Sequence, residues 1–174
     1  MKIRAVTLGM DLPVPEVAIE PFEVAGRFLA EARQAFEAAG IEVQTTRLCG
    51  PALESNAPGA SAGLRHWATS CEAAARQAGI EYISLGRVSA RRPDVVAEQV
   101  APILAAGEIA FLSADLIDGH LPSVAMAQAC ARAVKQLAFT TRLGFGNLRF
   151  AATAHCPPNI PFLPAAFHGG GPPC

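Results

Sequence analysis

The sequence contains little charge and no run of basic residues, and both features are unusual for a protein that binds nucleic acid. Charged residues make up 17% of the 174 residues, and the formal net charge is −1. No stretch reaches the roughly 18 uncharged apolar residues that a membrane-spanning helix needs, and residues 1–8 lack the apolar segment of a secretory signal. We therefore expect a cytoplasmic protein that binds neither nucleic acid nor a membrane.

Cysteine is sparse, and its five copies are scattered along the whole chain, without the paired spacing of a disulfide framework. We expect reduced thiols, three of them in the core. Soft metals are bound by residues of the types found at His155, Cys156, His168 and Cys174. Their spacing matches no standard zinc pattern, so we predict no metal site. The cofactor, if there is one, stays unknown.

Apolar residues make up 51% of the chain, and their spacing alternates between two periods. Short apolar and β-branched runs are typical of buried strands, and apolar residues three and four positions apart are typical of helices. Strands are predicted at residues 2–9, 41–48, 80–85, 108–112 and 148–154. Helices are predicted at residues 20–39, 64–78, 93–106 and 121–139. This alternation predicts an α/β fold with a mainly parallel sheet of five βα units.

The end of the chain differs in composition from the rest, because it is rich in proline and glycine. Such a backbone cannot pair as a helix or a central strand, so it needs a surface to lie against. We divide the chain into an α/β domain of residues 1–154 and an extended tail of residues 155–174. The tail is expected to approach a site or to bridge to a further part of the protein.

Ligands of parallel α/β folds gather at the edge where the strands end. This rule selects residues by their position alone and requires no motif. The selected residues are of mixed chemical types and match no single metal geometry. The ordinary alternative for each member is a solvated loop residue. The selected residues are Met10, Asp11, Arg47, Cys49, Arg87, Ser89, Ser113, Asp115, Asp118, His155 and Cys156.

Three of the chain's polar residues are candidate catalytic groups: His168, Asp115 and His155. His168 is the preferred acid–base group, because histidine titrates near neutral pH. Both leading candidates also have structural interpretations, since Asp115 suits the turn before a helix and His168 suits a turn with its glycine neighbours. Glycines beside His168 would let backbone N–H groups approach a substrate anion. The candidate substrate-binding residues are Asn159, Phe162, Gly169 and Gly170.

Two glycine motifs are similar to those of α/β-hydrolases, but their context does not fit. Residues 59–63 match G-x-S-x-G, and residues 168–171 match the HGGG of an oxyanion loop. The hydrolase serine must stand between a strand and a helix, with the oxyanion motif before it in the chain. Here the serine ends a long loop and the HGGG comes far later, so we do not predict this hydrolase mechanism.

Three stretches of the chain resemble one protein family. They are residues 3–9, residues 111–138 and residues 159–169, the last of which reads N-I-P-F-L-P-A-A-F-H-G. On these stretches the chain resembles the N-terminal part of the domain of unknown function 711 family. The resemblance implies a fold like the α/β barrel of pyruvate formate-lyase, in which two halves of five parallel strands form one barrel. Because the family's activity is not established, the resemblance implies no catalytic residues.

Under this resemblance, the five predicted βα units are one half of a ten-stranded barrel. Residues 155–174 would then lead to a C-terminal half that this chain lacks. An open half-barrel has exposed strand edges, and such edges pair readily with another chain. We therefore expect self-association, or pairing with the missing half.

The sequence favours an enzyme, or part of one, that acts on a small molecule at the carboxyl ends of the strands. One alternative is a non-catalytic small-molecule binding or regulatory module, because no catalytic motif is complete. Another is a truncated fragment without an independent function. The substrate, the reaction type and any metal dependence do not follow from the sequence.

Overall fold

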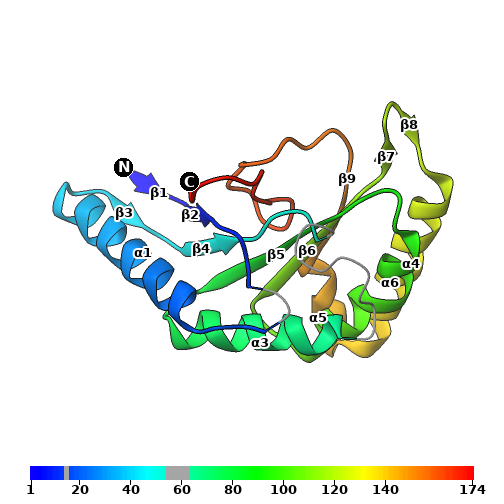
Figure 1. Ribbon diagram of the computed structural model, residues 1–174, viewed down its shortest axis with the longest axis horizontal. Coiled ribbons are helices and arrows are strands. Elements are labelled where there is room, and N and C mark those ends of the chain that lie inside the picture. Colours follow the sequence, from blue (N-terminus) through cyan, green and yellow to red (C-terminus); the bar gives the residue numbers. More distant parts are fainter. Residues whose placement is uncertain (14–15, 54–62) are drawn as a thin grey trace.

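The protein is an α/β fold built on a five-stranded parallel sheet (Figure 1). The computed structural model describes residues 1–13, 16–53 and 63–174. Every neighbouring pair of strands is parallel, and sheet order equals chain order. The strands are β2 (Val6–Gly9), β4 (Thr46–Cys49), β5 (Tyr82–Val88), β6 (Ala110–Asp115) and β9 (Phe150–Thr153). The predicted fold class and the mainly parallel sheet are therefore confirmed.

The first two predicted strands are each interrupted near their start. The short strand β1 (Lys2–Ile3) pairs in parallel with β3 (Glu42–Val43), in the register that β2 and β4 continue. Residues 4–5 separate β1 from β2, and residues 44–45 separate β3 from β4. The two interruptions lie side by side, and backbone hydrogen bonds continue across them, from the Gln44 N–H to the Ile3 carbonyl at 2.9 Å and from the Val6 N–H to the Thr45 carbonyl at 3.0 Å.

The third and fourth strands run further than predicted. The apolar pattern ended at residues 85 and 112, but β5 continues to Val88 and β6 to Asp115. Gly86 lies at a bulge in β5, where the register against β6 shifts. Its φ is 110°, and a Cβ there would collide with the Pro51 carbonyl, so only glycine fits. Arg87 of β5 and Ser113 and Asp115 of β6 are therefore strand residues, although the sequence analysis placed them after the strands.

The helices are α1 (Glu20–Ala38), α3 (Leu64–Gln77), α4 (Pro93–Val95), α5 (Ala101–Ala106) and α6 (Val124–Thr140). A π-helical segment, η1 (Val96–Val100), joins α4 to α5 where one continuous helix was predicted. Pro102 accounts for the irregularity, because it has no N–H to donate to the carbonyl one turn back. A 3-10 segment, η2 (Arg142–Arg149), follows α6. None of the helices among the described residues has the combined length and apolarity to pass through a lipid bilayer.

Helix α6 begins three residues later than predicted, because Ser123 caps it. The Ser123 hydroxyl accepts the Met126 N–H at 3.2 Å, which is the usual N-cap bond. The two residues before the cap instead form β8 (Leu121–Pro122), which pairs antiparallel with β7 (Ile117–Asp118). The turn between them contains Gly119, whose φ is 64°.

The helices cover one face of the sheet, and the C-terminal segment crosses the other face (Figure 1). The strand order explains this arrangement. Right-handed crossovers between strands that neighbour one another in sequence place every helix on the same side. The core between helices and sheet is one cluster, which includes Ile83 and Leu85 of β5, Leu112 of β6, Phe22 of α1 and Met126 of α6. We call the opposite side the helix-free face.

The C-terminal segment (residues 154–174) contains neither helix nor strand, yet hydrogen bonds tie it to the sheet. The Ser84 hydroxyl of β5 donates to the Ala166 carbonyl at 2.6 Å. The His168 N–H donates to the carbonyl of Gly50, directly after β4, at 2.8 Å. Ala166 and His168 are buried by this contact. The segment therefore packs onto the helix-free face in place of helices.

A buried carboxylate on α3 holds the start of β6. Glu72 is 7% exposed, and it accepts the backbone N–H groups of Glu108, Ile109 and Ala110 at 2.7, 3.2 and 3.1 Å. Gly107 makes room for it, because a Cβ there would collide with the Glu72 carboxylate. One side chain thus supplies the acceptors for three backbone donors as the chain enters the sheet.

Replacing Glu72 with glutamine should lower the free energy of unfolding by about 2 kcal/mol, because bonds to a charged acceptor are strong and an amide nitrogen cannot accept. Urea unfolding followed by circular dichroism measures the change. Glu98→Gln is the matched control, since Glu98 is exposed on η1. Equal stability of the two variants would contradict this account of Glu72.

Candidate functional site

An arginine–carboxylate pair lies at the carboxyl ends of β5 and β6. Arg87 Nη1 is 3.1 Å from Asp115 Oδ2, and the two side chains are 25% and 18% exposed. The Arg87 guanidinium also lies 4.3 Å from the centre of the Phe167 ring, which makes a cation–π contact. Asp115 Oδ1 accepts the N–H of Ile117 at 3.1 Å. Both carboxylate oxygens are therefore engaged, and the guanidinium is held between the sheet and the C-terminal segment.

The His168 imidazole is buried beside a thiol. The residue is 2% exposed, and its Nδ1 lies 3.5 Å from Cys174 Sγ. Its Nε2 lies 3.3 Å from the carbonyl oxygen of Gly171, which can only accept a hydrogen bond. In the neutral ring, the proton therefore belongs on Nε2, and Nδ1 presents its lone pair to the thiol. This is the arrangement of a base and its thiol partner, with a carbonyl that fixes the tautomer.

Gly9, the last residue of β2, makes this arrangement possible. A Cβ at Gly9 would lie 2.8 Å from His168 Nδ1 and 3.1 Å from Cys174 Sγ, so a side chain would displace both groups. Gly9 and Cys174 also exchange backbone hydrogen bonds. The Gly9 N–H donates to the Cys174 carbonyl at 2.7 Å, and the Cys174 N–H donates to the Gly9 carbonyl at 3.1 Å. These bonds hold the thiol beside the ring at the outer side of β2.

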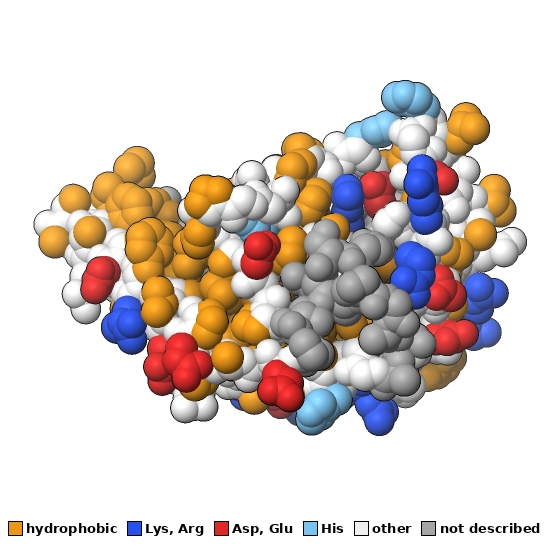
Figure 2. All heavy atoms as spheres, viewed as in Figure 1, with side chains coloured by type: hydrophobic (Ala, Val, Ile, Leu, Met, Phe, Trp, Pro, Cys, Tyr) orange, Lys and Arg blue, Asp and Glu red, His pale blue; other side chains and the backbone are white. Residues whose placement is uncertain are grey.

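An apolar groove of about 500 Å³ opens beside the thiol. Leu8 and Met10 form part of its wall, with Phe28 of α1 and Cys174 of the C-terminal segment. Figure 2 shows hydrophobic side chains gathered over α1 and the adjoining edge of the sheet. Phe28 is 53% exposed, because β2 ends the five-stranded sheet on this side and no further strand among the described residues covers the helix. The groove can accept an apolar group next to a sulfur nucleophile.

All five cysteines are free thiols, and they differ in accessibility. Burial raises the pKa of Cys49 and Cys71 to about 12, and that of Cys130 to about 11. These three thiols stay protonated near neutral pH and are chemically protected. Cys174 is exposed and Cys156 is half-buried. The expectation of three core cysteines is confirmed, and thiol chemistry is left to Cys174 and Cys156.

The helix-free face also carries buried polar atoms that lack partners. Ser113 of β6 is fully buried, and its hydroxyl has no hydrogen-bond partner within the described ranges. The same holds for Nε of Arg87, which lies opposite Ser113 in the register of β5 and β6. Buried polar groups without partners are rare in folded proteins, and each needs an explanation. A ligand that donates to and accepts from these atoms would supply one.

Two of the three predicted catalytic residues lie on the helix-free face near the ends of the strands. Asp115 pairs with Arg87, His168 lies against Cys174, and Phe167 connects the two pairs along the chain. His155 is different. It is exposed, with a φ of 54°, and makes no hydrogen bond or ion pair with the part of the chain that the structure describes.

The four predicted substrate-binding residues do not gather at one place. Asn159 Oδ1 accepts the Gly169 N–H at 2.8 Å, so these two residues shape the C-terminal segment. Gly170 has a φ of 86° and open space around it, which leaves its backbone accessible. Phe162 lines a separate pocket at the amino ends of the strands. Asn159 and the two glycines therefore lie close to His168, and Phe162 does not.

Sequence reasoning placed Arg47 at the wrong end of its strand and missed the partner of His168. Arg47 was expected after a strand, but it is the second residue of β4 and lies toward the amino edge. Cys174 was considered only as a metal ligand, although the triple glycine before it signals a chain reversal. Gly170 and Gly171 have φ values of 86° and 98°, and this reversal brings the thiol back to His168.

Two further sequence motifs were weighed for chemistry. The G-x-S-x-G motif lies outside the described residues, apart from Gly63. Within the described ranges, no group of three or more His, Cys, Asp or Glu side chains is arranged to hold a metal ion. The His168–Cys174 pair and the Arg87–Asp115 pair are the chemistry-bearing features near the carboxyl ends of the strands.

Comparison with known proteins agrees with the three stretches that suggested a family. The sequence model described as Uncharacterised ACR (DUF711) matches residues 1–174. No curated protein matches the chain. The match spans the βα units and the C-terminal segment with His168. The chain therefore belongs to the domain of unknown function 711 family.

Proposed function

We propose that the protein is an enzyme that acts on a small molecule at the carboxyl ends of the strands, with His168 as the base and Cys174 as the nucleophile. The observation that carries the proposal is the 3.5 Å approach of His168 Nδ1 to Cys174 Sγ at the wall of an apolar groove. The Gly171 carbonyl orients the ring, which completes the arrangement expected of an activated thiol.

The chemistry that this pair supports is acyl transfer. His168 Nδ1 takes the thiol proton, and the sulfur forms a bond to the carbonyl carbon of the substrate. The bond from that carbon to the leaving group then breaks, and the leaving group takes the proton from the imidazolium. Water attacks the resulting thioester, with His168 again taking a proton, and the thiol is released. Gly170 lies between His168 and Cys174 in the chain and has open space where a side chain would be, so we assign its backbone N–H as the donor to the developing oxyanion.

The second pair has a binding role in this proposal. Among the described residues, Arg87 Nε has no partner, and the equally unpaired hydroxyl of Ser113 lies opposite it in the register of β5 and β6. Asp115 and Phe167 hold the guanidinium in place, so Asp115 acts as a positioning residue and Arg87 as an anchor for a polar group of the substrate. His155 has no contact that supports its predicted catalytic role.

A non-catalytic binding module is the second candidate, and one observation favours it. The His168 ring is 2% exposed, and both of its nitrogens already have neighbours within 3.5 Å. A ring held in this way also fits a purely structural role, in which it ties the C-terminal segment to β2. In the enzyme, the ring activates the Cys174 thiol and the protein turns a substrate over, whereas the binding module requires no turnover.

Iodoacetamide should modify Cys174 at neutral pH roughly tenfold more slowly in His168→Gln than in the unmodified sequence, because the thiolate is the reactive form. Mass spectrometry of peptides, sampled over time, gives the rate at each cysteine. Cys156 is the internal control, and its rate should not change. Cys49 and Cys71, whose pKa values burial raises to about 12, should stay unmodified and thereby report an intact fold.

An unchanged rate at Cys174 in His168→Gln would reject the activated thiol. His168→Asn serves as a second variant if the first unfolds, as judged by modification of Cys49. Turnover is tested with p-nitrophenyl acetate, and Cys174→Ser should abolish any release of p-nitrophenol that exceeds the buffer rate. A His168-dependent thiol without such turnover would favour the binding module over the enzyme.

We also propose that the sheet is one half of a barrel. Five parallel strands in chain order, with every helix on one face, are the arrangement expected for half of a ten-stranded pyruvate formate-lyase-like barrel. The helix-free face carries buried polar side chains such as Ser84 and Ser113, as the interior of such a barrel would. The C-terminal segment then lies inside the barrel, where it contributes His168 to the site.

A second copy of the chain is the proposed partner at the β9 edge. Strand β9 pairs only with β6 among the described residues, so its other side offers free backbone donors and acceptors. The chain before β9 carries exposed apolar side chains, including Phe139 of α6 at 80% and Leu143 of η2 at 84% exposure. The net charge of −1 adds little repulsion between copies.

The isolated chain should therefore be a dimer or larger in size-exclusion chromatography with light scattering. Phe139→Glu combined with Leu143→Glu should shift it to a monomer, because burying two carboxylates at an apolar contact is strongly unfavourable. Leu121→Glu is the control, since Leu121 is 74% exposed on the β7–β8 hairpin. A monomeric unmodified chain, or a double variant that associates as before, would disprove this contact.

A further inference from the structure

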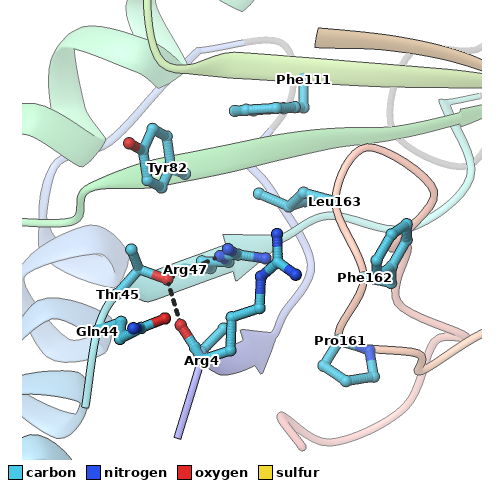
Figure 3. A pocket seen from close by; sticks show the side chains of 10 residues that line it. Arg4, Gln44, Thr45, Arg47, Tyr82, Phe111, Pro161, Phe162 and Leu163 are labelled. Carbon is cyan, nitrogen blue, oxygen red and sulfur yellow. Dashed lines mark hydrogen bonds between the residues drawn. The ribbon is translucent and has the colours of Figure 1, made fainter. Parts of the chain in front are cut away.

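A second pocket lies on the helix-free face, at the amino edge of the sheet and away from His168 (Figure 3). Its volume is about 580 Å³, within the range of small-molecule sites. It opens where β1 and β3 are interrupted before β2 and β4. Residues 4–5 and 44–45 line one side of it, and residues 161–163 of the C-terminal segment line another. The cavity thus lies between this edge of the sheet and the C-terminal segment.

Two guanidinium groups enter this pocket from neighbouring strands. Figure 3 shows Arg4 and Arg47 with their guanidiniums close together between the sheet and the C-terminal segment. Arg47 Nε donates to the Thr45 hydroxyl at 3.0 Å, and that hydroxyl donates to the Arg4 carbonyl at 2.9 Å. This relay fixes Arg47 through Nε and leaves its two terminal nitrogens, which are the usual fork for an oxyanion, directed away from the relay.

No carboxylate balances these two charges inside the pocket. None of the lining residues is Asp or Glu, and within the described ranges neither arginine forms an ion pair. Burial, and next the charge of Arg4, lower the pKa of Arg47. The nearby Glu81 is paired with Arg33 and with the Thr46 backbone. Two neighbouring like charges without a carboxylate among the residues that line the pocket form a site that an anion would stabilise.

The remaining walls are aromatic and apolar. Tyr82 and Phe111 meet edge to face, with ring centres 5.6 Å apart, and Arg47 lies 6.0 Å from the centre of the Tyr82 ring. Phe162 is 61% exposed and stands on the C-terminal segment across from them. Flat apolar groups pack well between aromatic rings. A ligand with an aromatic body would therefore contact these walls while its anionic group reaches the two arginines.

We propose that this pocket binds a small aromatic compound that carries a carboxylate or a phosphate. The oxyanion lies between the guanidiniums of Arg4 and Arg47, and the aromatic body lies between Tyr82, Phe111 and Phe162. The site is independent of the proposed thiol chemistry, because it is at the other end of the strands. Its occupation would also fix residues 161–163, and these lead directly into the buried part of the C-terminal segment.

Isothermal titration calorimetry with phenyl phosphate and benzoate tests the proposal on the full chain. At least one of the two should bind in a saturable manner, and the tighter one identifies the anionic group. Phenol, which lacks the charge, should bind at least roughly tenfold more weakly, because hydrogen bonds to charged groups are the strong class. Inorganic phosphate should also bind more weakly than phenyl phosphate, because it lacks the aromatic body.

Arg47→Gln and Arg4→Gln should each weaken binding of the tighter ligand roughly tenfold, and Arg47→Lys should weaken it less because it keeps the charge. Arg132→Gln is the matched control, since Arg132 is exposed on α6. Cys174→Ser should leave binding unchanged, which separates this site from the thiol. The proposal fails if neither anion binds, if phenol binds equally well, or if the Arg4 and Arg47 variants bind as tightly as Arg132→Gln.

Discussion

The order of the strands is the constraint on which the rest of this structure depends. Because each parallel strand lies beside its predecessor, the crossover helices all fall on one face of the sheet. In an open sheet with helices on both faces, apolar side chains are buried under helices on each face. In this sheet, only one face lies under helices. Its other face must be polar, covered by irregular chain, or both, and here Ser84 and Ser113 lie beneath a segment without helix or strand.

The C-terminal segment connects the two ends of that face. Its residues 161–163 line the pocket of Arg4 and Arg47 at the amino edge. Its His168 contacts Cys174 beside the end of β2. Between them, the Ala166 carbonyl accepts a hydrogen bond from the Ser84 hydroxyl, and the Phe167 ring contacts the Arg87 guanidinium. Every feature to which we assign chemistry therefore touches this one stretch. The family match includes it, so these contacts belong to the region that the family shares.

The sequence pattern identified the type and order of the elements, because apolar periodicity depends on which residues face the core. It could not find the bulge at Gly86, since this arises from contact with the distant backbone of Pro51. It also treated residues 93–106 as one helix, although Pro102 marks the irregularity at η1. His168 was identifiable as a titratable group among glycines, but its pairing with Cys174 required the chain reversal between them. Arg47 was assigned to the wrong edge, because the apolar pattern of residues 41–48 did not show the break at residues 44–45, which puts Arg47 near the start of β4.

The extra residue at Gly86 decides to which face of the sheet the later side chains of β5 point. In a regular strand, side chains three positions apart point to opposite faces, so Ser84 and Arg87 would be separated by the sheet. The bulge lets Ser84 lie opposite Phe111 and Arg87 opposite Ser113, and both then face the same way. Without this one residue, the guanidinium would point into the apolar layer beneath the helices. Gly86, which in the sequence looks like the end of the strand, therefore places the Arg87 guanidinium on the helix-free face.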